Sequence, residues 1–176
     1  MVNIRKRPLV VHLGNVGENS AKRTRAFASR FKTLDFLGID LANVKRTRKN
    51  WRQVQTEFIE GLSKLEDNSA SMITSNMALG YYDKTGKQVL EPEKSHVSRV
   101  RETIETCRRK LRPNGKLRIL ADAELVYDLL LPAMNGIFES QKLKVRLLKE
   151  SEYEKTNWLK QAKKELVPVY EILAQK

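Results

Sequence analysis

Apolar and polar positions follow one another along the chain in blocks that predict strands and helices in turn. Short, β-branched apolar runs at Pro8–Leu13, Leu34–Ile39 and Ala70–Ser75 are typical of buried strands, and we expect a further strand over residues 51–59. Residues 18–31 have helical tendency and a thin apolar face. Strand-like and helix-like segments therefore alternate in the first half of the chain.

Two longer helices are predicted in the second half. The first lies between Pro92 and Arg112 and is ended by the turn-forming segment 113–115. The second spans 125–138, with Asp122 as its cap and a kink at Pro132. The apolar stripe of the first helix, in which the cysteine is expected to be a core residue, consists of Val97, Val100, Ile104, Cys107 and Leu111.

The remaining strands suggest how the sheet closes. Residues 116–121 are expected to form a strand, residues 142–149 alternate charged and apolar positions, and residues 167–174 form a last apolar run. Strands that alternate with helices predict a largely parallel sheet covered on both faces. Two closing strands without a helix between them predict an antiparallel edge. We therefore expect one α/β domain over residues 1–176.

The charge of the chain points to a polyanionic partner. Among 176 residues, 34 are Lys or Arg and 21 are Asp or Glu, a formal net charge of +13. Residues 1–52 hold 13 of the basic residues and only three acids, which leaves +10 there. Nucleic acid is the favoured partner because phosphate contacts release condensed counterions. A general contribution to solubility is the alternative.

Composition also restricts compartment and chemistry. No apolar run approaches the length of a membrane span or a signal peptide, so no membrane association is expected. The single cysteine, Cys107, excludes an internal disulfide, and we expect a cytoplasmic protein. His12, His96 and Cys107 have no zinc-ligand spacing, so no metal is expected.

A glycine-containing turn follows the first predicted strand, and an acid follows the second. Gly14 and Gly17 lie in the turn, and Asp40 comes 26 residues after Gly14. In open α/β sheets, ligands bind at the carboxyl ends of the strands. Glycines allow close approach of the backbone to a ligand, and a carboxylate accepts hydrogen bonds from ribose hydroxyls. This spacing therefore favours a nucleoside-binding site.

Four segments carry a resemblance to a known family. "LVVHLGNVGE", "FLGIDL", "LEDNSASMITSNMAL" and "CRRKLRPNGKLRIL" resemble, over roughly residues 8–150, the class I S-adenosylmethionine-dependent methyltransferases. The last two segments are the most specific, because they reproduce turn residues as well as hydrophobicity. The resemblance implies a Rossmann-like three-layer fold whose seven-stranded sheet is mostly parallel, with one antiparallel strand near the C-terminus.

The same resemblance implies a cofactor, S-adenosyl-L-methionine, bound over the first three strands. The residues that match cofactor-binding positions are His12, Gly14, Asn15, Gly17 and Asp40. For the adenine the resemblance implies an acid after the third strand, Glu60 in preference to Glu57.

The cofactor loop departs from the family pattern, acid-x-Gly-x-Gly-x-Gly, at three positions. His12 replaces the acid, Val16 the middle glycine and Glu18 the last glycine. A valine side chain would crowd a backbone that must lie close to the cofactor, and a carboxylate would repel the cofactor's own carboxylate. Gly17 could relieve both effects by shifting the turn by one residue.

Substrate contacts are implied at two places. In the loop after the fourth strand, Asn76 would orient a substrate by hydrogen bonds, and Tyr81 or Tyr82 would stack on a base. The segment beginning at Ser151 is similar to the closing segment of tRNA (guanine-N7)-methyltransferases, in which Ser151 and Glu154 would hold the target base. The Pro-Asp-Pro-Trp segment of those enzymes is absent here.

Three functions fit the sequence. The first is methyl transfer from S-adenosylmethionine to a base of tRNA or rRNA, which the basic charge favours. The second is methyl transfer to a small molecule or a protein, which suits the loop at Asn76. The third is a non-catalytic RNA- or partner-binding module on a degenerate methyltransferase fold, which the substitutions at Val16 and Glu18 favour. No catalytic residue is assigned.

Overall fold

The chain folds around one seven-stranded sheet. The structure, a computed structural model, describes residues 7–14, 29–41, 50–76, 78–81, 83, 85, 87–89, 93–155 and 157–176. The strand order is β3-β2-β1-β4-β5-β7-β6. The strands are β1 (Leu9–Leu13), β2 (Asp35–Asp40), β3 (Trp51–Gln55), β4 (Ala70–Asn76), β5 (Leu111–Asp122), β6 (Leu143–Leu147) and β7 (Val169–Gln175).

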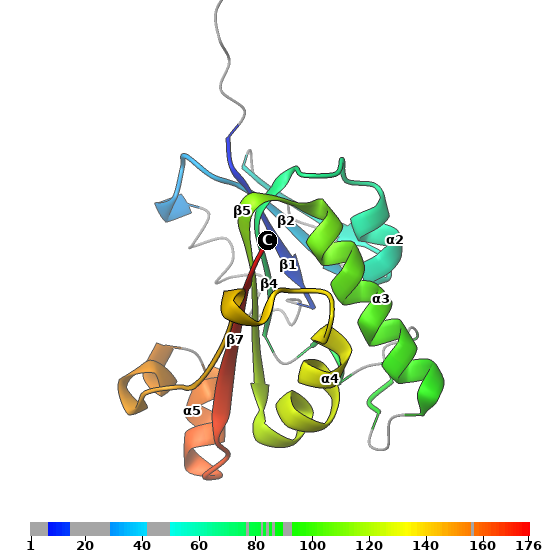
Figure 1. Ribbon diagram of the computed structural model, residues 1–176. Coiled ribbons are helices and arrows are strands. Elements are labelled where there is room, and N and C mark those ends of the chain that lie inside the picture. Colours follow the sequence, from blue (N-terminus) through cyan, green and yellow to red (C-terminus); the bar gives the residue numbers. More distant parts are fainter. Residues whose placement is uncertain are drawn as a thin grey trace, which may run out of the picture.

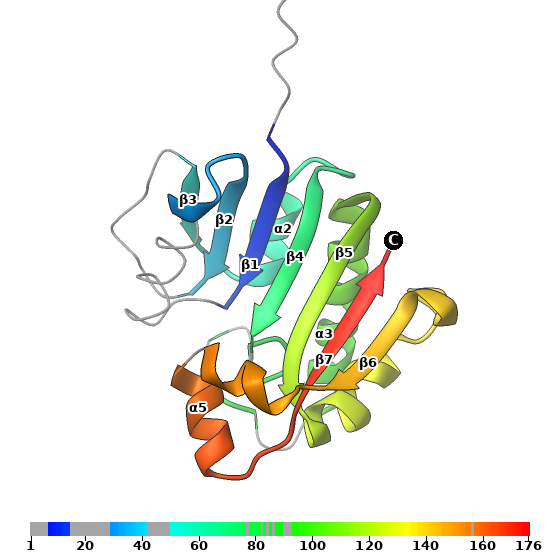
Figure 2. The same ribbon diagram turned by 90° about the vertical axis from the view of Figure 1, so that its left-hand side faces the viewer.

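Helices lie on both sides of this sheet. Figure 1 shows α2, α3 and α4 on one side and α5 on the other. Figure 2 looks onto the second side, where α5 lies beyond the lower ends of the strands; Leu159 and Ala162 of α5 pack there with Leu120 and Val169. The helical elements are α2 (Phe58–Ser63), α3 (Lys94–Lys110), η1 (Leu125–Leu130), α4 (Leu131–Met134), η2 (Ser140–Lys142), η3 (Glu150–Lys155) and α5 (Asn157–Lys164).

The main core fills the space between the sheet and α3, η1 and α4. Val11, Ile73 and Ile119 project from the central strands and pack with Ile104 and Cys107 of α3, and all five are buried. Cys107 is fully buried in this core, as predicted from its place on the apolar stripe, and this burial raises the pKa of its thiol to about 12.

The last strand lies inside the sheet. β7 pairs antiparallel with β5 on one side and with β6 on the other, whereas the other pairs are parallel. The predicted fold class, a mostly parallel sheet with one antiparallel strand near the C-terminus, is confirmed. The prediction that no helix separates the closing strands is wrong, because η3 and α5 lie between β6 and β7.

Two predicted boundaries also need correction. The strand expected over residues 51–59 ends at Gln55, because the Glu57 carboxylate accepts hydrogen bonds from the backbone N–H groups of Ile59 and Glu60 and so begins α2. The second long helix is capped by Asp122, as predicted, but begins as a π-helix at Leu125–Leu130. Pro132 lies in the first turn of α4, directly after this wider turn.

The helix predicted over residues 18–31 falls mostly outside the described residues. No described helix is long and apolar enough to span a membrane.

Candidate functional site

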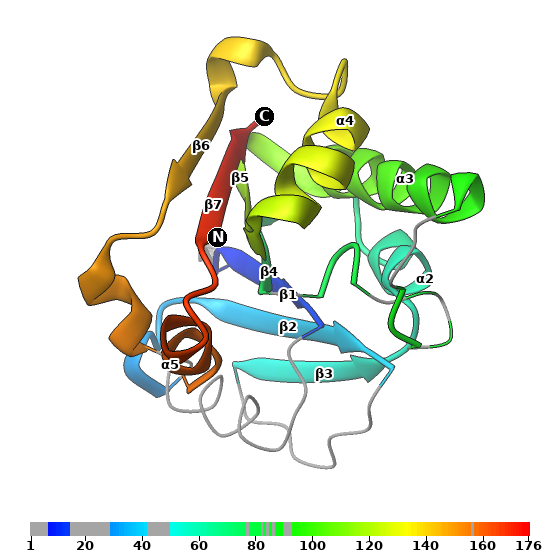
Figure 3. The same ribbon diagram turned by 90° about the horizontal axis from the view of Figure 1, so that it is seen from below.

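The parallel strands place the predicted cofactor residues along one edge of the sheet. β1, β2, β3 and β4 are mutually parallel, so their carboxyl ends meet at the same edge, which we call the carboxyl edge. Figure 3 views the molecule from this end, with η3 and α5 on one side of the sheet and α2, α3 and α4 on the other. Gly14, Asp40 and Asn76 all lie here, at the ends of three neighbouring strands.

His12 is a partly buried, uncharged residue near the end of β1. Burial lowers its pKa from 6.5 to about 4. Its ring stacks on Phe36, with centroids 6.0 Å apart, and Nδ1 lies 2.5 Å from Thr74 Oγ1 on β4. Nε2 is also buried and has no hydrogen-bond partner among the described residues. The imidazole therefore brings no negative charge to the position where the related pattern has an acid.

Gly14 is required by packing as well as by backbone conformation. Its φ is +68°, in the left-handed region that favours glycine, and its N–H donates to the carbonyl oxygen of Ile39 at 3.0 Å. A Cβ at this position would lie 2.0 Å from the Cβ of Ala78 and 3.2 Å from Cζ of Phe58. The loop after β4 thus fills the space beside Gly14. Asn15 and Gly17 lie outside the described residues.

Asp40 ends β2 at the position expected for a ribose-binding acid. Its side chain is half-buried, and its carbonyl oxygen accepts from the backbone N–H of Thr56 at 2.9 Å. This bond ties the end of β2 to the residue that follows β3.

The two glutamates considered for the adenine have different surroundings. Glu57 caps α2 and forms a salt bridge with Arg99 of α3 at 2.8 Å. Glu60 is exposed and accepts from Lys64 at 2.8 Å. The hydrogen bond from Lys64, together with the positive charge of that lysine, lowers the pKa of the Glu60 carboxyl. Glu57 is thus occupied by structural contacts, whereas Glu60 is accessible to solvent.

The loop after β4 is held in place by two side chains. The Ser75 hydroxyl accepts from the backbone N–H of Leu79 at 3.0 Å. His96 of α3 is buried, and its Nε2 lies 2.9 Å from the carbonyl oxygen of Gly80. Because a carbonyl only accepts, Nε2 must carry the proton. Asn76 begins this loop, and its Oδ1 is buried without a partner among the described residues.

The remaining predicted substrate residues lie at the same end of the molecule but in separate elements. Tyr81 is half-buried in the loop after β4, and Ser151 is exposed on η3. Tyr82 and the side chain of Glu154 lie outside the described parts of the chain. The neighbouring Tyr153 has a structural role, since its buried hydroxyl accepts from the N–H of Val169 at 2.8 Å.

Sequence reasoning did not single out Thr74 or assign a role to His96, although both fix the site. Thr74 holds His12 from the adjacent strand, and His96 anchors the loop from α3 across 16 residues of sequence. A polar residue within an apolar strand was the only available signal for Thr74. A buried histidine on a helix gave no comparable signal.

The acceptors along the carboxyl edge fit the donors of S-adenosylmethionine. Asp40 and Glu60 are carboxylates, and the Asn76 amide oxygen is buried without a described partner. The cofactor has ribose hydroxyls, an adenine amino group and an ammonium group, all of which donate hydrogen bonds. β3 and β4 are three strand spacings apart, about 14 Å, and this distance suits an extended nucleoside joined to an amino acid.

Comparisons with known proteins agree with this architecture. No protein-family model and no curated protein matches the sequence. Among solved structures, an SAM-dependent methyltransferase from Archaeoglobus fulgidus is similar, with 13% identity, a TM-score of 0.64, and coverage of 97% of this chain and 86% of that chain.

Two further structures have named substrates. Phosphoethanolamine N-methyltransferase 2 from Haemonchus contortus, in complex with S-adenosyl-L-methionine, is 15% identical with a TM-score of 0.58 over 97% of this chain and 49% of that chain. A 16S rRNA (adenine(1408)-N(1))-methyltransferase from Catenulisporales acidiphilia, with SAM as cosubstrate, is 12% identical with a TM-score of 0.54 over 96% and 85%. The similar structures thus include enzymes for small molecules and for rRNA, and this chain has the fold of the SAM-dependent methyltransferases.

Proposed function

We propose that this chain binds S-adenosylmethionine at the carboxyl edge and transfers its methyl group to a base of RNA. The observation that carries the proposal is the buried Oδ1 atom of Asn76, a hydrogen-bond acceptor without a described partner, in line with Asp40 on the same edge. A buried acceptor left unsatisfied costs about 1–3 kcal/mol, and a donor from a ligand would remove this cost.

The chain's own residues have distinct roles in this proposal. Asp40 would accept from the ribose hydroxyls and Glu60 from the adenine amino group. Asn76 would accept from the ammonium group or orient the substrate. The backbone near Gly14 would lie beside the methionine part. When bound, S-adenosylmethionine would supply a methyl group activated by a positively charged sulfonium.

Positioning is the main contribution expected of the protein. If the acceptor is an aromatic ring nitrogen with a free lone pair, no strong base is needed, and alignment of the acceptor accounts for most of the acceleration. Ser75 and His96 hold the loop that begins at Asn76, and this anchoring suits a surface that orients a base. His12 has a lowered pKa and is buried, so we assign it no role as a base.

Charge supports RNA as the substrate class. The net charge is +13, and a surface of that sign attracts phosphates strongly enough for affinity to depend steeply on salt. The rRNA methyltransferase among the similar structures is consistent with this choice. The resemblance of the tail to tRNA (guanine-N7)-methyltransferases favours a tRNA purine, with Ser151 and Glu154 beside it.

A second candidate is a non-catalytic binding module. It is favoured by the close contact between Ala78 and Gly14, which fills space beside the turn with polypeptide, and by the uncharged imidazole of His12. In that case the fold would present RNA-binding surfaces without transferring a methyl group.

Calorimetric titration with S-adenosylmethionine and S-adenosylhomocysteine tests the cofactor site. Asp40→Asn removes the charge at the carboxyl end of β2, and Asp35→Asn removes a charge at the opposite end of the same strand as a matched control. Micromolar binding that is weakened at least about tenfold only by Asp40→Asn would support the site. Absence of binding at millimolar ligand would reject both methyltransferase functions and leave the binding module.

Transfer of a labelled methyl group then tests the substrate class. Purified protein and labelled S-adenosylmethionine would be incubated with bulk tRNA, bulk rRNA, a protein extract and a small-molecule extract. We expect label in RNA. Label in the protein or small-molecule fraction alone would contradict the RNA assignment while leaving the cofactor site intact.

A further inference from the structure

Four cations gather on the face of the sheet opposite α3, over β5, β7 and β6. They are Lys116 and Arg118 of β5 and Lys144 and Arg146 of β6, and we call them the basic face. The register places Arg118 and Lys144 on either side of the same β7 residue, Leu173, so their side chains leave the sheet on the same side.

The acids within reach are already occupied. The carboxylate of Glu171 on β7 accepts from Arg118 Nε at 2.5 Å and from Arg146 Nε at 2.6 Å. Glu152 accepts from both terminal nitrogens of Arg146, at 2.6 and 3.0 Å. These bonds hold the arginines over the strands, and the negative charges of the two acids are balanced by the positive charges of the two arginines.

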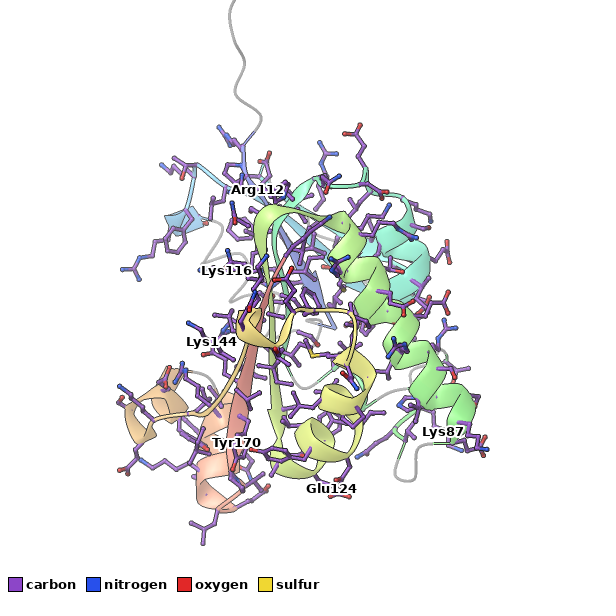
Figure 4. All side chains as sticks on the ribbon, viewed as in Figure 1. Lys87, Arg112, Lys116, Glu124, Lys144 and Tyr170 are labelled. Carbon is purple, nitrogen blue, oxygen red and sulfur yellow. The ribbon has the colours of Figure 1, made fainter. Side chains whose placement is uncertain are left out.

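Lys116 and Lys144 are exposed, and neither has an acidic partner among the described residues. Figure 4 shows both side chains on the side of the sheet away from α3 and α4. The basic face therefore presents the positive charges of Lys116 and Lys144 to solvent, beside two arginines that are held by ion pairs with Glu171 and Glu152.

The position of Lys116 is unusual for this type of sheet. A lysine on an edge strand such as β6 blocks unwanted strand pairing, and this role alone would explain Lys144. β5 is an internal strand between β4 and β7, and internal strands of a sheet covered on both faces are apolar nearly throughout. The alternation of Lys116 and Arg118 with buried Leu117 and Ile119 shows that one face of β5 is open to water.

We propose that the basic face binds the phosphate backbone of the RNA whose base is methylated at the carboxyl edge; this inference rests on the proposed function. Its cations extend over two strand spacings, about 10 Å, and so match an extended polyanion. The RNA would continue toward the carboxyl edge past Lys149 and Lys164, which are both exposed, on the side where η3 and α5 lie.

The test measures RNA affinity as a function of salt. The variant Lys116→Gln/Lys144→Gln removes two charges, and Lys87→Gln/Lys94→Gln removes two exposed lysines elsewhere, so that the net charge falls from +13 to +11 in both. Lys87 lies far from the basic face, at the lower end of the helix-covered side in Figure 4. The probe is a fluorescently labelled bulk tRNA pool. Its affinity for the protein is measured at several salt concentrations between about 50 and 300 mM, a range over which phosphate contacts weaken strongly.

We expect the basic-face variant to bind at least about tenfold more weakly at 100 mM salt, with a slope of log affinity against log salt that is smaller by about 1.5–2. The control variant should retain the wild-type slope and an affinity within about twofold, because its lysines would not contact RNA. Lysine acetylation followed by mass spectrometry gives a second readout on the wild type. RNA should protect Lys116 and Lys144 but not Lys87.

The outcomes separate this inference from the proposed function. Equal losses in both variants, or no protection of Lys116 and Lys144, would show that charge acts non-specifically and would overturn the basic face as the RNA site. Absence of RNA binding by the wild type would reject the RNA part of the proposed function, and the inference with it. Cofactor titration of each variant establishes that the carboxyl edge is intact.

Discussion

The buried imidazole of His12 makes the stability of this fold depend on pH in a way that one substitution can isolate. Its pKa is about 4 in the folded protein and about 6.5 when the chain is unfolded. A lowered histidine pKa means that the unfolded chain binds a proton more readily than the folded one. The contribution of neutral His12 to the free energy of unfolding is therefore fully present above pH 6.5, and it is lost as the pH falls from 6.5 toward 4.

The size of the effect follows from these two values. One pKa unit corresponds to about 1.4 kcal/mol, so the full loss by pH 4 is about 3 kcal/mol. Between pH 7 and pH 5, where few carboxylates titrate, the free energy of unfolding should fall by about 2 kcal/mol through His12 alone. This loss is a large part of the stability of a typical domain, about 5–15 kcal/mol.

The assay is urea denaturation of the wild type and of His12→Gln at pH 7, 6 and 5. Glutamine can still form a hydrogen bond with Thr74 but does not titrate, so the variant should lose about 2 kcal/mol less than the wild type over this range. The absolute stability of the variant is immaterial, because only its pH dependence is compared. Parallel curves for the two proteins would refute a buried, neutral His12.

Three further substitutions test contacts described above. Gly14→Ala should destabilise the fold by about 3 kcal/mol or more in thermal melts. The control is Gly136→Ala, which has φ +75° and nothing within 4 Å of the added Cβ, and which should cost only about 1–2 kcal/mol. Equal losses in the two variants would contradict the packing described at Gly14. Glu171→Gln should cost about 1–2 kcal/mol by urea denaturation, with less effect at high salt, since its two arginines lose a shared counter-charge. Tyr153→Phe should cost about 1–2 kcal/mol because the N–H of Val169 loses its acceptor, and an unchanged unfolding midpoint would exclude that bond.

Much of the sheet could be predicted because its strands carry strong local signals. Apolar runs marked β1, β2 and β4, and the segment after residue 115 alternated in the way that β5 does. α5 was missed because, among residues 159–164, where the side chains of this lysine-rich helix are described, only Leu159 and Ala162 are buried, and two apolar positions are too few to mark a helix.

The candidate site could be predicted in position but not in its contacts. Asp40 lies at the end of β2, as the spacing indicated, because strand length and turn chemistry fix the edge of a parallel sheet. Gly14 and Ala78 are in contact although they are 64 residues apart in the sequence, and a local sequence pattern cannot predict a contact of that kind. The cofactor and substrate roles of these residues stay predictions.

The place of β7 inside the sheet has a consequence for the order in which the fold assembles. β5 and β6 each bond to β7 and not to one another, so each has an unpaired edge until residues 169–175 insert between them. A growing chain must therefore hold two open strand edges while η3 and α5 are being made. Such edges are templates for pairing with other chains. Agents that slow the insertion of β7 should divert newly made protein into aggregates before they alter the finished fold.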